Sequence, residues 1–252
     1  MGGVEEANVR NVPDQTAERV LVVIAHPDDA EFWAGGTVAW WTDARIEVTY
    51  CVLSDGEAGG FDPAIPRSQI PQVRRVEQAE GAALLGVHDV RFFGLGEGGI
   101  RLTSRDLHVD LVRVIRQVRP QRVVTWSPEW NWQRFRSCHP DHLATGAAVL
   151  TAIYPNAGNP FALPQLKEQE GLDAWTVPEV WLINSPAREV NHYVDITDTF
   201  DRKVAAVRAH ASQIKDPDKL ADRLRERIAP NTAAAGLAEG RLAEAFQVVV
   251  TG

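Results

Sequence analysis

Short apolar runs alternate with amphipathic segments through the first half of the chain. Runs typical of strands are Val20–Ala25, Ile46–Leu53, Val90–Phe93 and Arg122–Trp126. The first run is apolar without alternation, which is typical of a central parallel strand buried on both faces. Segments with apolar residues at helical spacing are Trp33–Trp41, Val73–Leu85, and the stretch that Ser104 can cap and Pro120 ends.

This alternation of strands and helices predicts a parallel sheet with right-handed crossovers. We therefore expect an α/β fold of the Rossmann-like, three-layer α/β/α type, with a mainly parallel sheet in a single domain. In the strand order 3-2-1-4, the first and fourth strands are neighbours at the switch point, where ligands bind. The domain is expected to span residues 18–252, after a flexible N-terminal tail at residues 1–17.

The second half of the chain gives a weaker pattern. Tyr154–Thr176 carries three prolines and is predicted to be a long insertion near the site. Val180–Ile183 and Val190–Val194 suggest a hairpin around Asn184-Ser185-Pro186. Helices are expected at Thr199–Gln213 and Pro217–Ile228, and a closing strand at Ala245–Val250.

Ionisable residues follow the first predicted strand directly, in the sequence His26-Pro27-Asp28-Asp29. Uncompensated buried carboxylates are costly, so these side chains should be solvated, paired or bound to a metal. If Pro27 opens a helical turn, His26 and Asp29 share one face and Asp28 points elsewhere. This spacing indicates two ligands for one metal ion, with a free carboxylate beside it.

A second cluster, His139-Pro140-Asp141-His142, follows the fourth predicted strand and has the same form. The predicted strand order brings the two clusters together. Together they supply His, Asp and His, the nitrogen and oxygen ligands that zinc accepts in a catalytic site with an open position for water. The alternative is that each cluster is only a helix N-cap after a strand.

The composition limits the classes of function. A net charge of −8 argues against a general nucleic-acid-binding protein, which would need a basic surface. No run of about 18 apolar residues is present, so we expect no membrane span. The polar, acidic N-terminus lacks the apolar core of a signal peptide, and a cytoplasmic location is expected. The sequence leaves open whether the protein forms a homo-oligomer.

The two cysteines do not make a disulfide framework. Cys51 lies in an apolar run and is expected to be a core thiol. Cys138 adjoins His139, which leaves a Cys–His nucleophile as an alternative.

The two histidine motifs together resemble those of the LmbE-like, or PIG-L, family of zinc-dependent N-deacetylases, which act on N-acetylglucosamine conjugates. Supporting matches are Ser54-Asp55-Gly56-Glu57, the segment from Arg74 and Glu77 to Leu85-Gly86, and His210-Ala211-Ser212-Gln213. The resemblance spans roughly residues 20–215 by motif position.

The resemblance implies that zinc is held by His26, Asp29 and His142. Asp28 would be the general base that takes a proton from the attacking water. His139 would stabilise the tetrahedral intermediate or act on the leaving amine, with Asp141 orienting its ring. Arg74 would contact sugar hydroxyls.

Further substrate contacts are expected from Glu57, Glu97, Trp130 and His210. Trp130 could stack on a sugar, or it could be a packing residue. Some relatives carry a tyrosine oxyanion donor two residues before the first histidine of the second motif, where this chain has Ser137. Glu97 is the nearest candidate for the aspartate that relatives have in the loop after the third strand.

Three functions stay open. The first is an N-deacetylase acting on a small-molecule amino-sugar conjugate, such as a thiol-cofactor precursor or a glycosylated natural product. The second is an amidase that removes a larger acyl group, as in mycothiol-conjugate amidases. The third is a non-catalytic Rossmann-like nucleotide-binding module, which would bind nucleotide and no metal.

Overall fold

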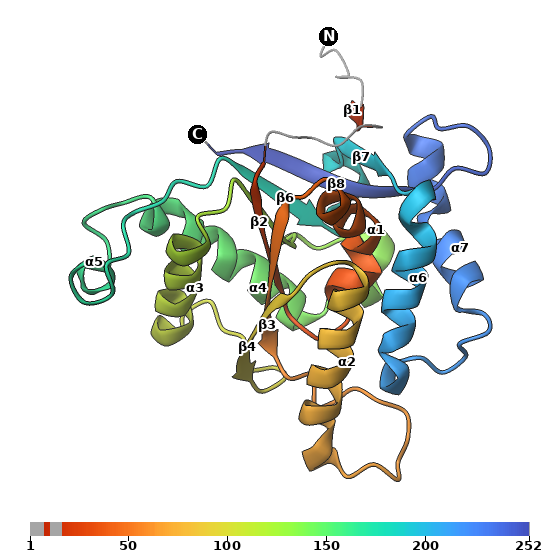
Figure 1. The fold of residues 1–252 in the computed structure, drawn as a ribbon, viewed down its shortest axis with the longest axis horizontal. Coiled ribbons are helices and arrows are strands. Elements are labelled where there is room, and N and C mark those ends of the chain that lie inside the picture. Colours follow the sequence, from red (N-terminus) through yellow and green to blue (C-terminus); the bar gives the residue numbers. More distant parts are fainter. Residues whose placement is uncertain (1–7, 11–16, 252) are drawn as a thin grey trace.

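The computed structural model describes residues 8–10 and 17–251, which form an eight-stranded sheet with helices on both sides (Figure 1). The strands are β1 (Asn8–Arg10), β2 (Arg19–Ile24), β3 (Glu47–Ser54), β4 (Asp89–Leu95), β5 (Arg122–Trp126), β6 (Glu179–Ile183), β7 (His192–Asp195) and β8 (Ala243–Val250). Their order is β1-β7-β8-β6-β5-β2-β3-β4. Strand β8 runs antiparallel to both of its neighbours, and the other pairings are parallel.

The predicted fold class and the predicted order of the first four strands are confirmed. Strands β4-β3-β2-β5 are the expected 3-2-1-4 arrangement, and Val22 on β2 pairs with Tyr50 on one side and Val124 on the other. Residues 20–24 of β2 are almost completely buried, as expected for a strand covered on both faces. This position places the C-terminal ends of β2 and β5 side by side.

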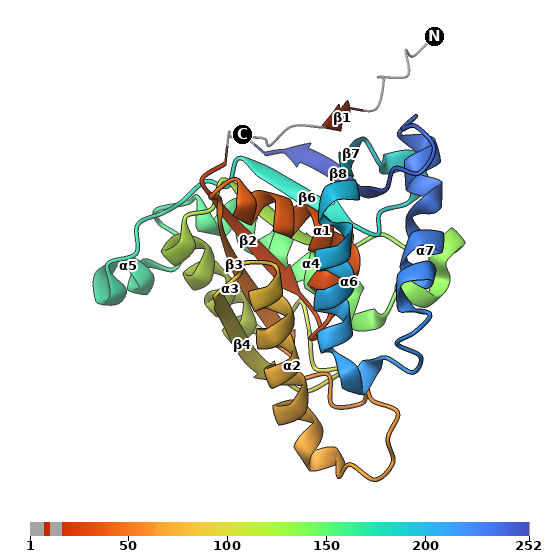
Figure 2. The same cartoon turned by 45° about the vertical axis from the view of Figure 1, so that its right-hand side comes forward.

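Helices cover both faces of the sheet. The helices are α1 (Asp29–Asp43), α2 (Ile70–Leu84), α3 (Arg105–Val118), α4 (Pro140–Thr151), α5 (Pro164–Glu170), α6 (Phe200–Ala209) and α7 (Leu220–Ala234). Helices α1, α2 and α6 pack together on one face, and α3 and α4 lie on the other (Figures 1 and 2). Ser104 caps α3 as predicted, because its hydroxyl accepts a hydrogen bond from the Leu107 amide. The layers are therefore α/β/α.

The predicted hairpin between β6 and β7 is wrong. Strand β8 lies between them and pairs with β6 through residues 247–250 and with β7 through residues 243–246. Both strands are antiparallel to β8 and so run in the same direction. The residues around Asn184-Ser185-Pro186 therefore carry the chain across β8 instead of reversing it.

The predicted insertion, Tyr154–Thr176, does not lie near the site. It contains α5, which extends to the left of the sheet in Figure 1. The Trp175 indole donates a hydrogen bond of 2.8 Å to the carbonyl of Pro120, just before β5 begins. This contact holds the segment near the N-terminal end of β5. The two histidine clusters follow the C-terminal ends of β2 and β5, at the opposite edge of the sheet.

Most of the predicted tail, residues 1–7 and 11–16, lies outside the described residues. Asn8–Arg10 forms β1, which pairs with β7. Among the helices of the described chain, none is long and apolar enough to cross a membrane.

Candidate active site

Three side chains from the two histidine clusters meet beyond the C-terminal ends of β2 and β5. His26 Nδ1 lies 3.2 Å from His142 Nε2 and 3.7 Å from Asp29 Oδ2. His142 Nε2 lies 3.3 Å from Asp29 Oδ1. The three residues are close enough to hold one metal ion. The structure thus brings together the three residues predicted as ligands.

The local backbone that achieves this differs from the prediction. Pro27 does not open a helical turn, because Asp28 has a φ of 99° and α1 begins only at Asp29. A left-handed conformation is rare outside glycine and is often found at functional sites. It turns the chain so that the Asp29 carboxylate folds back and accepts a 2.9 Å hydrogen bond from the His26 amide. In the second cluster the proline does open a helix, because Pro140 occupies the first position of α4 and His139 is its N-cap.

Neighbouring groups orient each ligand. His142 Nδ1 lies 2.9 Å from the Ser137 carbonyl, which can only accept, so Nδ1 carries the proton and Nε2 is free. The Trp126 indole stacks on the same imidazole at a centroid distance of 3.5 Å. His26 Nε2 faces Asp141 Oδ2 at 3.4 Å, which leaves His26 Nδ1 free on the side of the other ligands. Both free nitrogens therefore point into one space.

The arrangement fits a tetrahedral metal ion. Donors bound at about 2.0–2.1 Å in tetrahedral geometry lie about 3.3 Å apart, close to the separations found here. Asp29 Oδ2 already accepts from the His26 amide and from Trp126 Nε1, at 2.9 and 3.2 Å, which leaves Oδ1 for the metal. Burial would lower the pKa of His26, but Asp141 and Asp29 raise it to about 10. The site therefore strongly favours a positive charge.

Asp28 lies beside the three candidate ligands, and hydrogen bonds from other residues fix its position. Its Oδ2 receives a 3.0 Å hydrogen bond from Arg74, and its amide donates 2.9 Å to Gln78 Oε1. Burial raises the pKa of Asp28 to about 6, and the neighbouring Arg74 opposes that rise. These contacts leave Oδ1 of Asp28 as the oxygen available to a reacting group.

Arg74 is buried, and both of its Nη atoms donate hydrogen bonds to protein oxygens. Besides Asp28, it donates to the carbonyls of Gly56, at 2.7 Å, and Pro27. A Cβ on Gly56 would lie 2.0 Å from Arg74 Nη1, so only glycine leaves room for this approach. Arg74 therefore positions Asp28, and its predicted contact with sugar hydroxyls stays a prediction.

The loops after β3 and β4 form another side of the site. Glu57 Oε1 accepts from the Glu97 amide at 2.8 Å, and Glu97 Oε1 lies 3.8 Å from His139 Nε2. The Asp141 carboxylate accepts from the Gly98 amide at 2.7 Å and faces His26. Asp141 was expected to orient the ring of His139, and the structure directs it to His26 instead. His139 is partly exposed, and burial together with His26 and His142 lowers its pKa.

His210 lies behind the site and does not line it. It is completely buried, with Nε2 3.3 Å from Glu31 Oε2. Glu31 Oε1 accepts a 2.7 Å hydrogen bond from Gln78, which in turn binds the amide of Asp28. Sequence reasoning missed the role of Gln78. Its place one turn after Arg74 on the same helix was the available signal.

Trp130 belongs to an exposed aromatic cluster that also contains Trp132 and Phe135. Its ring lies 5.4 Å from that of Trp132 and 5.7 Å from that of Phe135, in stacked orientations. Cys138 is buried, and its sulfur accepts from the Asn131 amide at 3.1 Å, which disfavours the nucleophile alternative. Cys51 is a buried core thiol, as expected.

Fold and site together define an α/β protein with a candidate metal centre at the switch point of its sheet. The sequence profile of the PIG-L family, described as GlcNAc-PI de-N-acetylase, matches residues 21–153, a little over half of the chain. The chain therefore belongs to the PIG-L family.

Relatives cover most of the chain. It is 31% identical to the diacetylchitobiose deacetylase of Thermococcus kodakarensis, over 82% of this chain and 74% of the relative. It is also 31% identical to a probable N-acetyl-α-D-glucosaminyl L-malate deacetylase of Bacillus cereus, over 77% of this chain and 83% of the relative. The structure of N,N′-diacetylchitobiose deacetylase from Pyrococcus horikoshii superimposes with a TM-score of 0.83 and 27% identity, covering 94% of this chain and 86% of that one.

Proposed function

We propose that this protein is a zinc-dependent hydrolase that removes an N-acetyl group from an N-acetylglucosamine-type amino sugar on a small-molecule conjugate. The observation that carries the proposal is the meeting of free donor atoms from His26, Asp29 and His142, with the carboxylate of Asp28 beside them. The amino-sugar substrate is supported by the relatives, which are named as deacetylases of diacetylchitobiose and of N-acetylglucosaminyl malate.

His26, Asp29 and His142 would hold the zinc ion. When bound, zinc supplies Lewis acidity, which lowers the pKa of water and polarises a carbonyl oxygen. Asp28 Oδ1 takes the proton of the attacking water, because Oδ2 is held by Arg74. The rigid hold on Asp28 from Arg74 and Gln78 fixes the direction in which it accepts that proton.

His139 would act on the other side of the scissile amide. It is partly exposed, and its ring centroid lies 4.9 Å from that of His26. A neutral imidazole can donate a hydrogen bond to the carbonyl oxygen, and negative charge developing there favours its protonated form. His139 or Asp28 then delivers the proton that the leaving amine requires.

The first test separates catalysis from metal binding. Asp28→Asn removes the base but none of the donors, so the variant should keep the zinc content of the wild type while acetate release falls about 10²-fold or more. Asp218→Asn on the exposed surface is the control and should match the wild type. Full activity in the Asp28 variant would overturn the assignment of the base.

The acyl group needs its own comparison. We expect faster release of acetate from an N-acetyl amino sugar than of a bulky acid from the corresponding N-acyl compound. The reverse preference would favour the amidase alternative. Nucleotide binding without bound metal would instead favour a non-catalytic module.

A further inference from the structure

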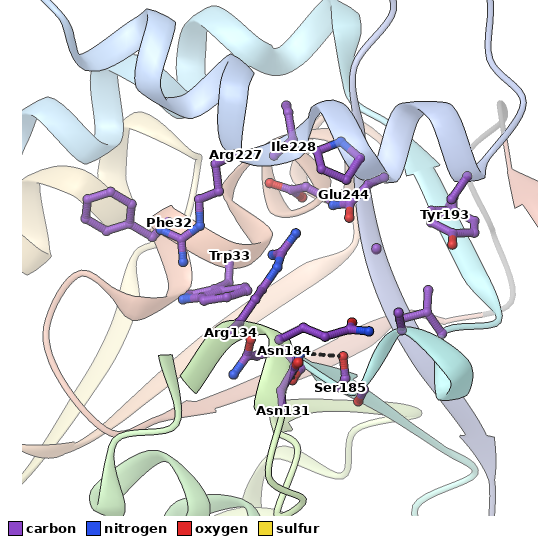
Figure 3. Close-up of a pocket in the computed structure, with 17 residues that line it drawn as sticks. Phe32, Trp33, Asn131, Arg134, Asn184, Ser185, Tyr193, Arg227, Ile228 and Glu244 are labelled. Atoms are coloured by element: carbon purple, nitrogen blue, oxygen red, sulfur yellow. Dashed lines mark hydrogen bonds between the residues drawn. The ribbon is translucent and has the colours of Figure 1, made fainter. Parts of the chain in front are cut away.

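One cavity among the described residues is not used by the reaction described above. It has a volume of about 270 Å³ and lies between α1, the loops after β5 and β6, and α7 (Figure 3). Trp33 on its wall lies 5.2 Å from Trp126, ring to ring, and Trp126 stacks on the ligand His142. The rings of Trp33 and Trp126 therefore separate the cavity from the ligand His142.

Two guanidinium groups enter this cavity from different elements. Arg134 comes from the loop after β5 and Arg227 from α7, and Figure 3 shows both pointing into the space beside Trp33. Arg227 Cζ lies 4.0 Å from the centroid of the Trp33 ring. Within the described residues, neither guanidinium has a hydrogen bond or a carboxylate partner. Burial and the charge of Arg134 lower the pKa of Arg227 to about 10, against the opposing effects of Asp28 and Asp29.

This lack of partners sets Arg134 and Arg227 apart from the fully buried arginines of the described residues. The buried guanidinium groups of Arg74, Arg116 and Arg122 all have oxygen acceptors. The carboxylate on the cavity wall, Glu244, is already bound by Lys203 at 2.5 Å and by the amides of residues 36 and 37. Two like charges held together in a partly buried cavity repel each other, so an anion between them would be stabilised.

Unpaired polar atoms on the same wall point to a ligand independently. Ser185 Oγ, Asn131 Oδ1 and Asn184 Oδ1 are buried without a hydrogen-bond partner in the described part of the chain. Buried polar atoms are rarely left unsatisfied, because each costs about 1–3 kcal/mol. The wall therefore offers a hydroxyl donor and amide oxygens beside two cations, which together suit an anionic group attached to a polar, hydroxyl-bearing fragment.

We propose that this cavity binds a carboxylate or phosphate on the aglycone of the amino-sugar substrate, with Arg134 and Arg227 as its specificity-determining residues. The proposal rests on the proposed function, because it names the class of conjugate that the same site would accept. Guanidinium groups suit both anions, since each can donate two parallel hydrogen bonds to the anion's oxygens. The charges of Asp28 and Asp29 act on Arg227, so we expect this guanidinium to lie within reach of a substrate bound at the metal centre.

The test compares three glycosides with small aglycones, one neutral, one bearing a carboxylate and one bearing a phosphate. The probes are the methyl, carboxymethyl and 2-phosphoethyl 2-acetamido-2-deoxy-α-D-glucopyranosides, assayed for acetate release with the zinc-loaded enzyme. We expect at least about tenfold higher kcat/KM for one of the charged probes, as one charge-assisted hydrogen bond is worth about 1.5–3 kcal/mol. Which charged probe is preferred distinguishes a carboxylate from a phosphate.

Arg134→Gln and Arg227→Gln should each lower the ratio of charged to neutral kcat/KM toward one. Because both rates come from one protein, a loss of folded enzyme cancels in the ratio. Arg136→Gln on the same loop and Arg223→Gln on the same helix are matched exposed controls and should keep the wild-type ratio. An unchanged ratio in both cavity variants, or no preference in the wild type, would overturn the proposal.

Calorimetry with the corresponding 2-amino glycosides separates this inference from the proposed function. It needs no turnover, so it gives an answer even if no probe is deacetylated. If the wild type binds an amine with an anionic aglycone more tightly than the methyl glycoside, and Arg227→Gln loses this preference, the anion site would be supported even though the proposed reaction had failed. Equal binding of amines with anionic and neutral aglycones would reject the proposed anion site, whatever the outcome of the activity assays.

Discussion

Replacing Arg74 with glutamine should change the pH at which the enzyme becomes active. Arg74 Nη2 lies 3.0 Å from Asp28 Oδ2, and both side chains are largely buried. The guanidinium favours the ionised carboxylate, so it keeps the pKa of Asp28 lower than burial alone would make it. Glutamine can still donate a hydrogen bond but carries no charge, and the pKa of Asp28 should therefore rise.

The size of the shift follows from the contact. For charge centres about 4 Å apart, the attraction is about 1 kcal/mol in a water-like medium and about 4 kcal/mol at an effective dielectric constant of about 20. One pKa unit corresponds to about 1.4 kcal/mol, so we expect a rise of about one unit or more. A bound metal ion acts on the wild type and the variant alike, so this difference survives its presence.

The sign is set by the role of Asp28. The ionised carboxylate is the base, so activity is present above its pKa and is lost as the pH falls through that value. A raised pKa moves the acid limb of the kcat/KM profile to higher pH by the same amount. The assay is acetate release against pH with the zinc-loaded enzyme.

Arg75→Gln is the matched control. Arg75 is the next residue on α2 and forms a 2.7 Å ion pair with Asp55 instead of Asp28. Its acid limb should stay in the wild-type position. An unmoved limb in the Arg74 variant, or equal shifts in both variants, would refute the reasoning that Arg74 acts through the charge of Asp28.

Three further predictions concern the framework of the site. Gly146→Ala places a Cβ 2.2 Å from the Trp126 carbonyl oxygen, so urea unfolding should show a loss of about 1–3 kcal/mol, and an unchanged midpoint would contradict this packing. Trp126→Phe keeps an aromatic ring but removes the indole donor to Asp29 Oδ2, so zinc titration should show about 10–100-fold weaker binding. Wild-type zinc affinity in this variant would show that the hydrogen bond is dispensable. Lys203→Met leaves Glu244 buried without its cation and should cost about 3–5 kcal/mol in the same unfolding assay, whereas wild-type stability would mean that Glu244 finds another partner.

The half of the fold that carries the site was predictable from the sequence. The unbroken apolar run of β2 indicated a central strand, and the alternation with helices indicated a parallel sheet, in which the order 3-2-1-4 makes β2 and β5 neighbours. Because parallel strands end at the same edge, the residues after each strand had to meet. For this reason the two clusters were expected at one site, whereas the choice of His142 over His139 as a ligand came from the resemblance to the PIG-L family.

The parts that failed depend on contacts between distant segments. Strand β8 lies between β6 and β7, and a strand about sixty residues further on leaves no local trace near Asn184. The left-handed conformation of Asp28 is imposed by its surroundings, since a residue other than glycine does not favour it. The contact of Asp141 with His26, instead of His139, likewise depends on side-chain directions that spacing does not determine.

The central claim is that His26, Asp29 and His142 hold a zinc ion on which hydrolysis depends. The most direct measurement is calorimetric titration of zinc into chelator-stripped protein, comparing the wild type with His142→Ala and with the exposed control His88→Ala. We expect one tightly bound ion per chain, together with restored acetate release, in the wild type and the control, and loss of that binding in His142→Ala. Wild-type stoichiometry and affinity in His142→Ala would contradict it.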